Sequence, residues 1–147
     1  MIVGQEANDA VLTESTENTE IDMDINDITY KVRGAIFEVH KTLGPGLFES
    51  VYEAALLYEL EKLGLNVRSQ VGLPVQYKEA ILDVGFRIDI LVEDIVIIEL
   101  KSVDSLMNVH KKQLLTYLKL SGKKLGLLVN FNESILVDRV SLVRIIN

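Results

Sequence analysis

Two carboxylates and a lysine lie inside a strongly apolar stretch near the middle of the chain. Asp89 stands in the apolar run 86–92, and Glu99 and Lys101 stand in a second apolar run, 95–101. Charged side chains in such runs are costly to bury unless they are paired or bind a metal. Two acids and a lysine that converge on one patch could hold a divalent cation and position a water beside it. That arrangement suits metal-assisted hydrolysis of a phosphodiester.

The two apolar runs meet at Glu93-Asp94, a turn signal that predicts a β-hairpin. Directly opposed residues of an antiparallel pair point to the same face. A two-residue turn would pair Asp89 with Ile98 and turn it away from Glu99. A one-residue change of register reverses the face. We therefore predict a three-residue loop or a bulge, which would bring Asp89 opposite Glu99.

A second interpretation of the E-x-K pattern is a solvated strand face with a cross-strand ion pair. Glu99 and Lys101 are two residues apart and share a face of their strand. The neighbouring residues 95–98 and Leu100 are apolar on both faces, which favours a central strand over an exposed edge. Both interpretations stay open at this point.

The composition bounds the class of protein. The chain has 147 residues, enough for one domain with a core, and it has no cysteine. Disulfides and thiolate metal sites are therefore excluded, and a reducing cytoplasm fits. No run approaches the ~20 apolar residues of a membrane span, and residues 1–10 lack the basic start of a secretory signal.

The net charge of −7 is concentrated at the start of the chain. Residues 1–27 hold eight acidic side chains and no lysine or arginine. Subtracting these eight from 22 acids leaves 14 acids against 15 bases, so the remainder carries about +1. We expect an acidic, disordered tail at 1–26 and one folded domain at 27–147. The tail is either a solvated extension or a segment that mimics nucleic-acid charge.

Apolar periodicity and turn residues predict an α/β domain with a mixed sheet flanked by helices. The helix at 25–43 has Asp27 as its expected N-cap. The expected element order is α-α-β-β-β-α-β-(β). The helices are expected at 25–43, 47–63 and 106–120, and the strands at 67–77, 80–92, 95–101, 124–131 and 137–146.

The helix at 47–63 carries a further group of candidate site residues. Glu49 lies three residues before Tyr52 and four before Glu53, so the three share one helix face. Glu49 also follows Gly44-Pro45-Gly46, and an acid near a helix start is favoured by the helix dipole whatever its function.

The helix at 106–120 carries His110, Gln113 and Tyr117 at i, i+3 and i+7. Such residues are also common on the edge of an ordinary amphipathic helix. Lysines in and after this helix form a modest patch that could bind phosphate. They are Lys111, Lys112, Lys119, Lys123 and Lys124.

Together these motifs resemble the GxxExxY proteins, a branch of the PD-(D/E)XK nuclease superfamily close to the RecB-like nucleases. The resemblance covers about residues 28–146. It rests on Gly46-x-x-Glu49-x-x-Tyr52, Asp89, Glu99-x-Lys101, His110-x-x-Gln113-x-x-x-Tyr117 and the strand at 128–131. Ile88 stands where the superfamily name has proline.

The resemblance implies a restriction-endonuclease-like fold with a Mg²⁺ or Mn²⁺ site. Asp89, Glu99 and the Leu100 carbonyl would be metal ligands, with Glu49 as a further ligand, directly or through water. Lys101 would orient the attacking water and stabilise charge on the phosphate. The remaining candidates would bind the substrate or brace the site: Gln113, Tyr117, Tyr52, His110, Lys111, Lys112 and Lys119.

The resulting expectation is a cytoplasmic, metal-dependent nuclease, with DNA favoured over RNA and no membrane partner. So short a nuclease could need a homodimer to cut both strands. The alternative is a non-catalytic module that binds nucleic acid or protein on a nuclease fold. The near-neutral body favours that alternative, whereas the complete set of Asp89, Glu99 and Lys101 favours the enzyme.

Overall fold

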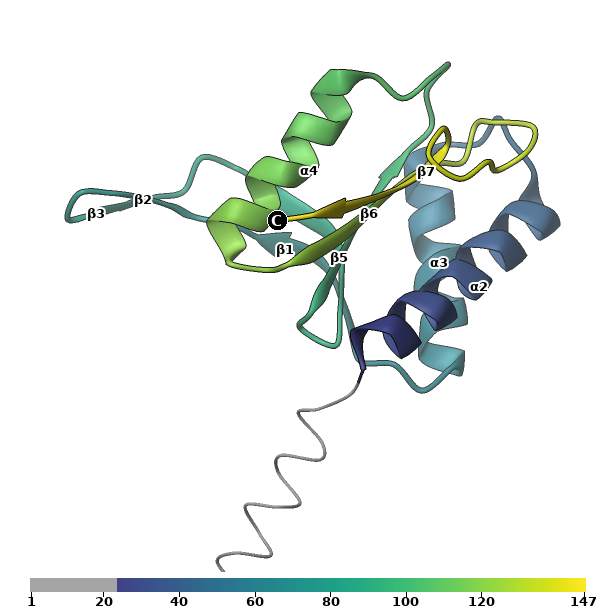
Figure 1. The fold of residues 1–147 in the computed structure, drawn as a ribbon, viewed down its shortest axis with the longest axis horizontal. Helices are drawn as coiled ribbons and strands as arrows, with labels where there is room; N and C mark the ends of the chain where they lie inside the picture. The colour runs from purple at the N-terminus through teal and green to yellow at the C-terminus, as the bar shows by residue number, and fades with distance from the viewer. Residues whose placement is uncertain (1–23) are drawn as a thin grey trace, which may run out of the picture.

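Three helices and two β-sheets make up residues 24–147, the part of the chain that the computed structural model describes. The larger sheet has five strands in the order β1-β4-β5-β6-β7, and β2 and β3 form a separate pair (Figure 1). The mixed α/β architecture is the expected restriction-endonuclease-like one. The elements are α2 (Ile25–Leu43), α3 (Glu49–Lys62), β1 (Val67–Gly72), β2 (Val75–Tyr77), β3 (Ala80–Leu82), β4 (Arg87–Val92), β5 (Val96–Lys101), α4 (Asn108–Ser121), β6 (Leu125–Asn130) and β7 (Leu142–Ile146).

The first described helix, α2, follows its apolar spacing closely. Ile28, Val32 and Ile36 are fully buried, as the 3.6-residue period requires of one face. The helix is capped by Asp24, whose carboxylate accepts a hydrogen bond from the backbone N–H of Asn26 at 2.9 Å. The prediction of Asp27 as the N-cap is therefore wrong, because Asp27 already lies in the first helical turn.

The register of β4 and β5 confirms the predicted odd-numbered loop. Val92 pairs with Val96 and Ile90 with Ile98 in an antiparallel ladder. The connection is therefore the three residues 93–95, with φ of 53° at Glu93 and 57° at Asp94. β5 also pairs in parallel with β6, so it is the central strand of the sheet, as predicted.

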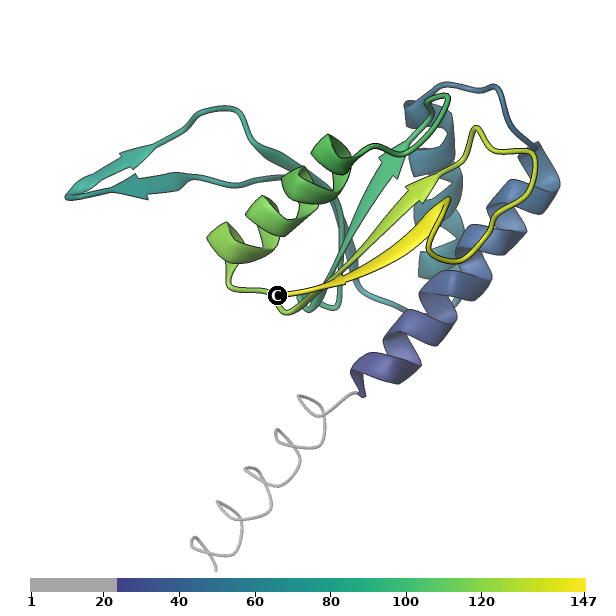
Figure 2. The same ribbon diagram turned by 45° about the horizontal axis from the view of Figure 1, so that its top comes forward.

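Two expected long strands are each divided in two, which corrects the prediction for 67–77 and 80–92. β1 ends at Gly72, and Pro74 has no N–H with which to continue a ladder. The chain then leaves the sheet and returns at Arg87, so that β2 and β3 pair only with each other. Figures 1 and 2 show this hairpin projecting from the body. The last strand is also shorter than expected, because β7 begins only at Leu142.

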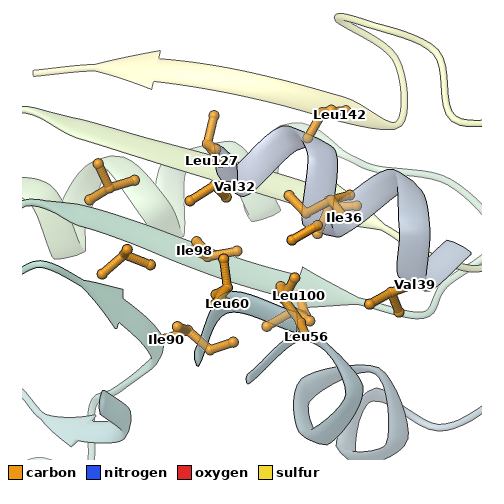
Figure 3. Close-up of a cluster of buried hydrophobic side chains, with 14 of the residues drawn as sticks. Val32, Ile36, Val39, Leu56, Leu60, Ile90, Ile98, Leu100, Leu127 and Leu142 are labelled. Carbon is orange, nitrogen blue, oxygen red and sulfur yellow. The ribbon is translucent and has the colours of Figure 1, made fainter. Parts of the chain in front are cut away.

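The sheet is covered on both faces. α2 and α3 bury the larger apolar cluster against one face, where Ile36 and Leu56 pack over Ile98 and Leu100 (Figure 3). α4 covers the other face through a smaller cluster that includes Leu114. This two-sided burial explains why four of the six residues of β5 are apolar, on both faces of the strand.

Two further expectations concern the N-terminal tail and membrane-spanning helices. The acidic tail predicted for residues 1–26 lies almost wholly outside the described residues. Within the part that is described, no helix has the length and apolar character needed to cross a membrane.

Candidate active site

Asp89 and Glu99 bridge the two central strands at the point where their ladder stops. The Asp89 Oδ2 atom accepts a hydrogen bond from the backbone N–H of Leu100 at 2.9 Å. The Glu99 Oε1 atom accepts one from the backbone N–H of Asp89 at 3.1 Å. Each carboxylate thus bonds the opposite strand's backbone where a regular ladder would use a carbonyl. The strands fork here, and both carboxylates lie in the fork.

Strand β4 changes face at Asp89. Ile88 and Ile90 are two residues apart, so a regular strand would point both to one face. Ile88 instead belongs to the cluster under α4, together with Leu91, and Ile90 belongs to the cluster under α2 and α3. Asp89 stands at the changeover. Its side chain is therefore directed along the sheet toward the N–H of Leu100 rather than into either apolar layer.

Gln70 is a site residue that the sequence analysis did not find. The register of β1 with β4 pairs Ser69 with Ile90 and Val71 with Ile88, which brings Gln70 opposite Asp89. Gln70 has a φ of 51°, an uncommon value for a residue with a side chain. Its Nε2 atom donates to Glu53 at 2.9 Å and lies 3.5 Å from Asp89 Oδ1.

A cavity of about 220 Å³ lies between the strand fork and the start of α3. Three of its six lining residues are acids, so it is suited to a cation rather than to an anion. The lining residues are Glu49, Ser50, Glu53, Gln70, Asp89 and Leu100. Glu99 borders the same fork from the α4 face of β5, the face to which Ile97, two residues earlier, also points.

Burial and charge raise the pKa of Glu99 to about 9. Its side chain is buried, with an exposure of 3%, and loss of hydration is the largest cause. The negative charge of Asp89 raises the pKa further, and Lys101 offsets only a small part of this. Two close carboxylates therefore lack a compensating positive charge, which is the condition that a bound cation would relieve.

Lys101 is held by a chain of polar side chains from α4. Its Nζ donates to Gln113 Oε1 at 3.1 Å, and Gln113 Nε2 donates to the Tyr117 hydroxyl at 3.1 Å. Burial raises the pKa of Tyr117, whose ring also packs against Phe86. The structure thus brings together the E-x-K lysine and the predicted Gln113 and Tyr117 pair.

Tyr52 braces the loop that leads into α3 and Glu49. Its hydroxyl donates to the Gly44 carbonyl at 2.6 Å and accepts from the Leu47 N–H at 3.1 Å. The ring stacks on Phe131 with centroids 4.5 Å apart. Because Glu49 and Tyr52 are three residues apart on one helix, the buried Tyr52 ring holds in place the helix turn that carries the exposed Glu49 at the cavity.

Glu49 is engaged with the protein rather than with the carboxylate pair. Its Oε1 accepts a hydrogen bond from the Ser102 N–H at 3.3 Å, just beyond the end of β5. The Ser102 hydroxyl in turn donates to the Leu47 carbonyl at 2.6 Å. These bonds tie the start of α3 to the strand that carries Glu99 and Lys101.

The other predicted substrate-binding residues form no hydrogen bond or ion pair with this fork. His110 accepts a hydrogen bond from the Met107 N–H at 2.9 Å, so it caps the start of α4. Among the described residues, no hydrogen bond or ion pair connects Lys111, Lys112 or Lys119 to the carboxylates. Their part in binding substrate stays a prediction.

The donor atoms fit a divalent cation only in part. Asp89 and Glu99 supply the oxygen ligands that hard cations prefer. However, residues 24–147 contain no group of three or more histidine, cysteine or acidic side chains gathered closely enough to hold a metal ion. A cation at the fork would need backbone oxygen, water or substrate oxygen to complete its coordination, as Mg²⁺ commonly does.

The family model described as the PD-(D/E)XK nuclease superfamily matches residues 26–143. The chain belongs to the PD-(D/E)XK nuclease superfamily. No curated protein and no solved structure matches the chain significantly. Members of the superfamily are generally nucleases, which hydrolyse nucleic acids and typically use divalent metals. The acidic fork, the lysine beside it and the family therefore indicate one class of chemistry.

Proposed function

We propose that this protein is a metal-dependent nuclease that hydrolyses phosphodiester bonds, in DNA rather than RNA. The observation that carries the proposal is the strand fork, where Asp89 and Glu99 lie together with Lys101 two residues further along β5. A buried acid with so high a pKa is expensive for a fold without a partner. A catalytic site accounts for that cost.

Asp89, Glu99 and the Leu100 carbonyl are the proposed ligands of Mg²⁺ or Mn²⁺, with Glu49 joining through water. When bound, the cation supplies Lewis acidity toward the phosphate and lowers the pKa of a nearby water. Mg²⁺ keeps several waters in its coordination shell. A direct protein set of only two carboxylates and one carbonyl is therefore compatible with the proposal.

Lys101 is the proposed group that orients water and stabilises negative charge on the phosphate. Its ammonium has three donors, and Gln113 accepts one of them at 3.1 Å. Two donors remain for the water and a phosphate oxygen. Tyr117 fixes Gln113, so α4 controls the direction of the lysine. Hydrolysis joins the water oxygen to phosphorus and breaks one phosphorus–oxygen bond of the nucleic-acid backbone.

The activity is tested by incubating the full chain with labelled single- and double-stranded DNA and with RNA, in Mg²⁺, Mn²⁺ or EDTA. Cleavage should need metal and should be lost in Lys101→Ala. Lys62→Ala is the matched control, because Lys62 is an exposed lysine in the last turn of α3, outside the lysine patch of α4. Equal loss in both variants would point to a general charge effect and against the assigned role of Lys101.

The metal is tested directly by anomalous diffraction from crystals soaked in Mn²⁺. A peak between the Asp89 and Glu99 carboxylates is expected. No peak at saturating Mn²⁺, combined with nucleic-acid binding but no cleavage, would support the alternative of a non-catalytic binding module.

A further inference from the structure

A second cavity lies at the β6–β7 edge of the sheet, away from the acidic fork between β4 and β5. Its volume is about 260 Å³, and it is lined by residues of α2, the middle of β6, the loop before β7 and β7 itself. Arg144 on β7 pairs with Leu127 on β6, whose side chain packs into the α2 and α3 cluster. The cavity therefore lies beside α2 and shares no lining residue with the cavity at the fork.

The cavity has an excess of positive charge. Arg33, Arg139 and Arg144 line it, and Asp138 is the one acid among its lining residues. Asp138 is already bound by Arg33, which donates to both carboxylate oxygens at 2.5 and 3.2 Å. Among the described residues, neither Arg139 nor Arg144 forms an ion pair. The guanidinium groups of Arg139 and Arg144 therefore line this cavity without a paired carboxylate from the part of the chain that the structure describes.

Two features restrain the Arg33 side chain and the Arg139 backbone. Arg33 is held on one side by Asp138 and on the other by the Phe37 ring, 5.3 Å from its guanidinium carbon. Arg139 has a φ of 68°, a left-handed conformation that glycine or asparagine adopts more readily. Backbone strain of this kind is concentrated at functional sites such as ligand clamps. The strained turn is maintained by the Arg139 N–H, which donates to the Leu142 carbonyl at 2.8 Å.

From this geometry we infer that the cavity binds the terminal phosphate of a phosphomonoester. Guanidinium groups match phosphate oxygens in bidentate pairs. A phosphomonoester carries a charge of about −2 at neutral pH, equal to the formal excess of three arginines over one aspartate. A backbone phosphodiester carries only one negative charge and matches less well. The volume admits a phosphate with a sugar-sized group but not a duplex.

The site is tested by NMR titration of the ¹⁵N-labelled full chain at low salt. The probes are inorganic phosphate, adenosine monophosphate, adenosine, and a short oligonucleotide with hydroxyl ends. Phosphate and the monophosphate should shift the amides of residues 138–144, and adenosine and the oligonucleotide should leave them unmoved. Shifts of equal size with adenosine, or none with either phosphate, would overturn the assignment.

Three variants separate this site from general charge effects. Arg144→Gln should weaken phosphate binding about tenfold or more, because one charge-assisted pair is lost. Arg68→Gln is the matched control, since it removes the same charge from β1 at the other sheet edge. Arg139→Gly should weaken binding while leaving the melting temperature equal or higher, because glycine relieves the positive φ. Equal weakening in Arg68→Gln, or full affinity in Arg139→Gly, would refute the site.

The pH dependence gives an independent check. A phosphomonoester loses its second charge below a pKa of about 6. Arginine stays charged, and the hydrogen bond from Arg33 lowers the pKa of Asp138. The charged groups that line the cavity therefore do not titrate between pH 5 and 7.5. Affinity for the monophosphate should fall by several-fold at pH 5, and a pH-independent affinity would contradict recognition of the dianion.

Discussion

The Glu99 carboxylate accepts a hydrogen bond from the backbone N–H of Asp89 at 3.1 Å, across the fork between β4 and β5. This contact joins two acids whose negative charges repel each other. The hydrogen bond favours the ionised form of Glu99, whereas burial and the Asp89 charge favour the protonated form, and the latter effects are larger. Without a cation, ionisation of Glu99 therefore destabilises the fold.

The first prediction concerns Asp89→Asn. The amide oxygen can still accept from the Leu100 N–H, and the repulsion of Glu99 is removed. Cleavage should fall by about 100-fold or more, since metal-derived stabilisation is worth several kcal/mol. The melting temperature in EDTA should stay equal or rise. A large fall in melting temperature would instead identify Asp89 as a structural residue.

The second prediction concerns the pH dependence of stability without metal. The pKa of Glu99 is about 9 in the fold, against an ordinary value of 4.5. Between these values the unfolded chain releases the proton and the folded chain retains it, so stability falls as pH rises. Glu99→Gln removes this loss. In EDTA, the melting temperature of the variant should equal that of the parent near pH 4.5 and exceed it by ~5 °C or more at pH 8. A constant difference across this range would contradict the raised pKa.

The third prediction concerns the support of Lys101. Gln113→Ala removes the acceptor of its ammonium, and Tyr117→Phe removes only the hydroxyl that holds Gln113. Misplacement of a catalytic group costs up to about 100-fold in rate. We therefore expect kcat to fall less in Tyr117→Phe than in Gln113→Ala. KM should change little. Thr116→Ala, on the same helix with its hydroxyl bound to the Lys112 carbonyl, is the control. A rise in KM alone would show that Gln113 binds substrate instead.

The sequence predicted the fork because its determinants are local. Runs of apolar β-branched residues defined β4 and β5, and face alternation required an odd-numbered loop between them, which Val92 and Val96 flank in the structure. The Gln113 and Tyr117 pair could equally be predicted from the sequence, since residues four apart on a helix share a face. His110 caps the start of α4 in the structure, and its predicted part in binding substrate or bracing the site stays a prediction, because both roles have the same sequence appearance.

Gln70 and the projecting hairpin could not be predicted in this way. Gln70 reaches Asp89 through the register of β1 with β4, which joins segments 19 residues apart. Its φ of 51° breaks the alternation on which strand prediction depends. The pairing of β2 with β3 follows from the way the chain leaves the sheet at Pro74, and a strand of three residues carries too little periodicity to detect.

The fourth prediction concerns Gln70. Gln70→Gly relieves the left-handed backbone, and Gln70→Ala retains it, while both lose the contacts with Glu53 and Asp89. The alanine variant should unfold more easily than the glycine variant by ~1 kcal/mol. Both should cleave more slowly than the parent, because Asp89 loses a neighbour that restrains it. Chemical denaturation and cleavage rates measure the two effects, and full activity in both variants would exclude Gln70 from the site.

The last prediction concerns the acidic N-terminal segment and the helix that follows it. Residues 1–23 hold six acids and no bases, so their deletion changes the net charge from −7 to −1. Binding of DNA by the Lys101→Ala chain in EDTA should strengthen at low salt after this deletion, and the gain should disappear as salt screens the charges.

The melting temperature should change little on that deletion, because Asp24 still caps α2. Asp24→Ala in the full chain should instead cost ~1 kcal/mol through loss of the bond to the Asn26 N–H. Fluorescence anisotropy across a salt series and thermal unfolding give the two readouts. DNA affinity that is unchanged at every salt concentration would show that the segment does not compete with nucleic acid for the basic side chains of the folded body.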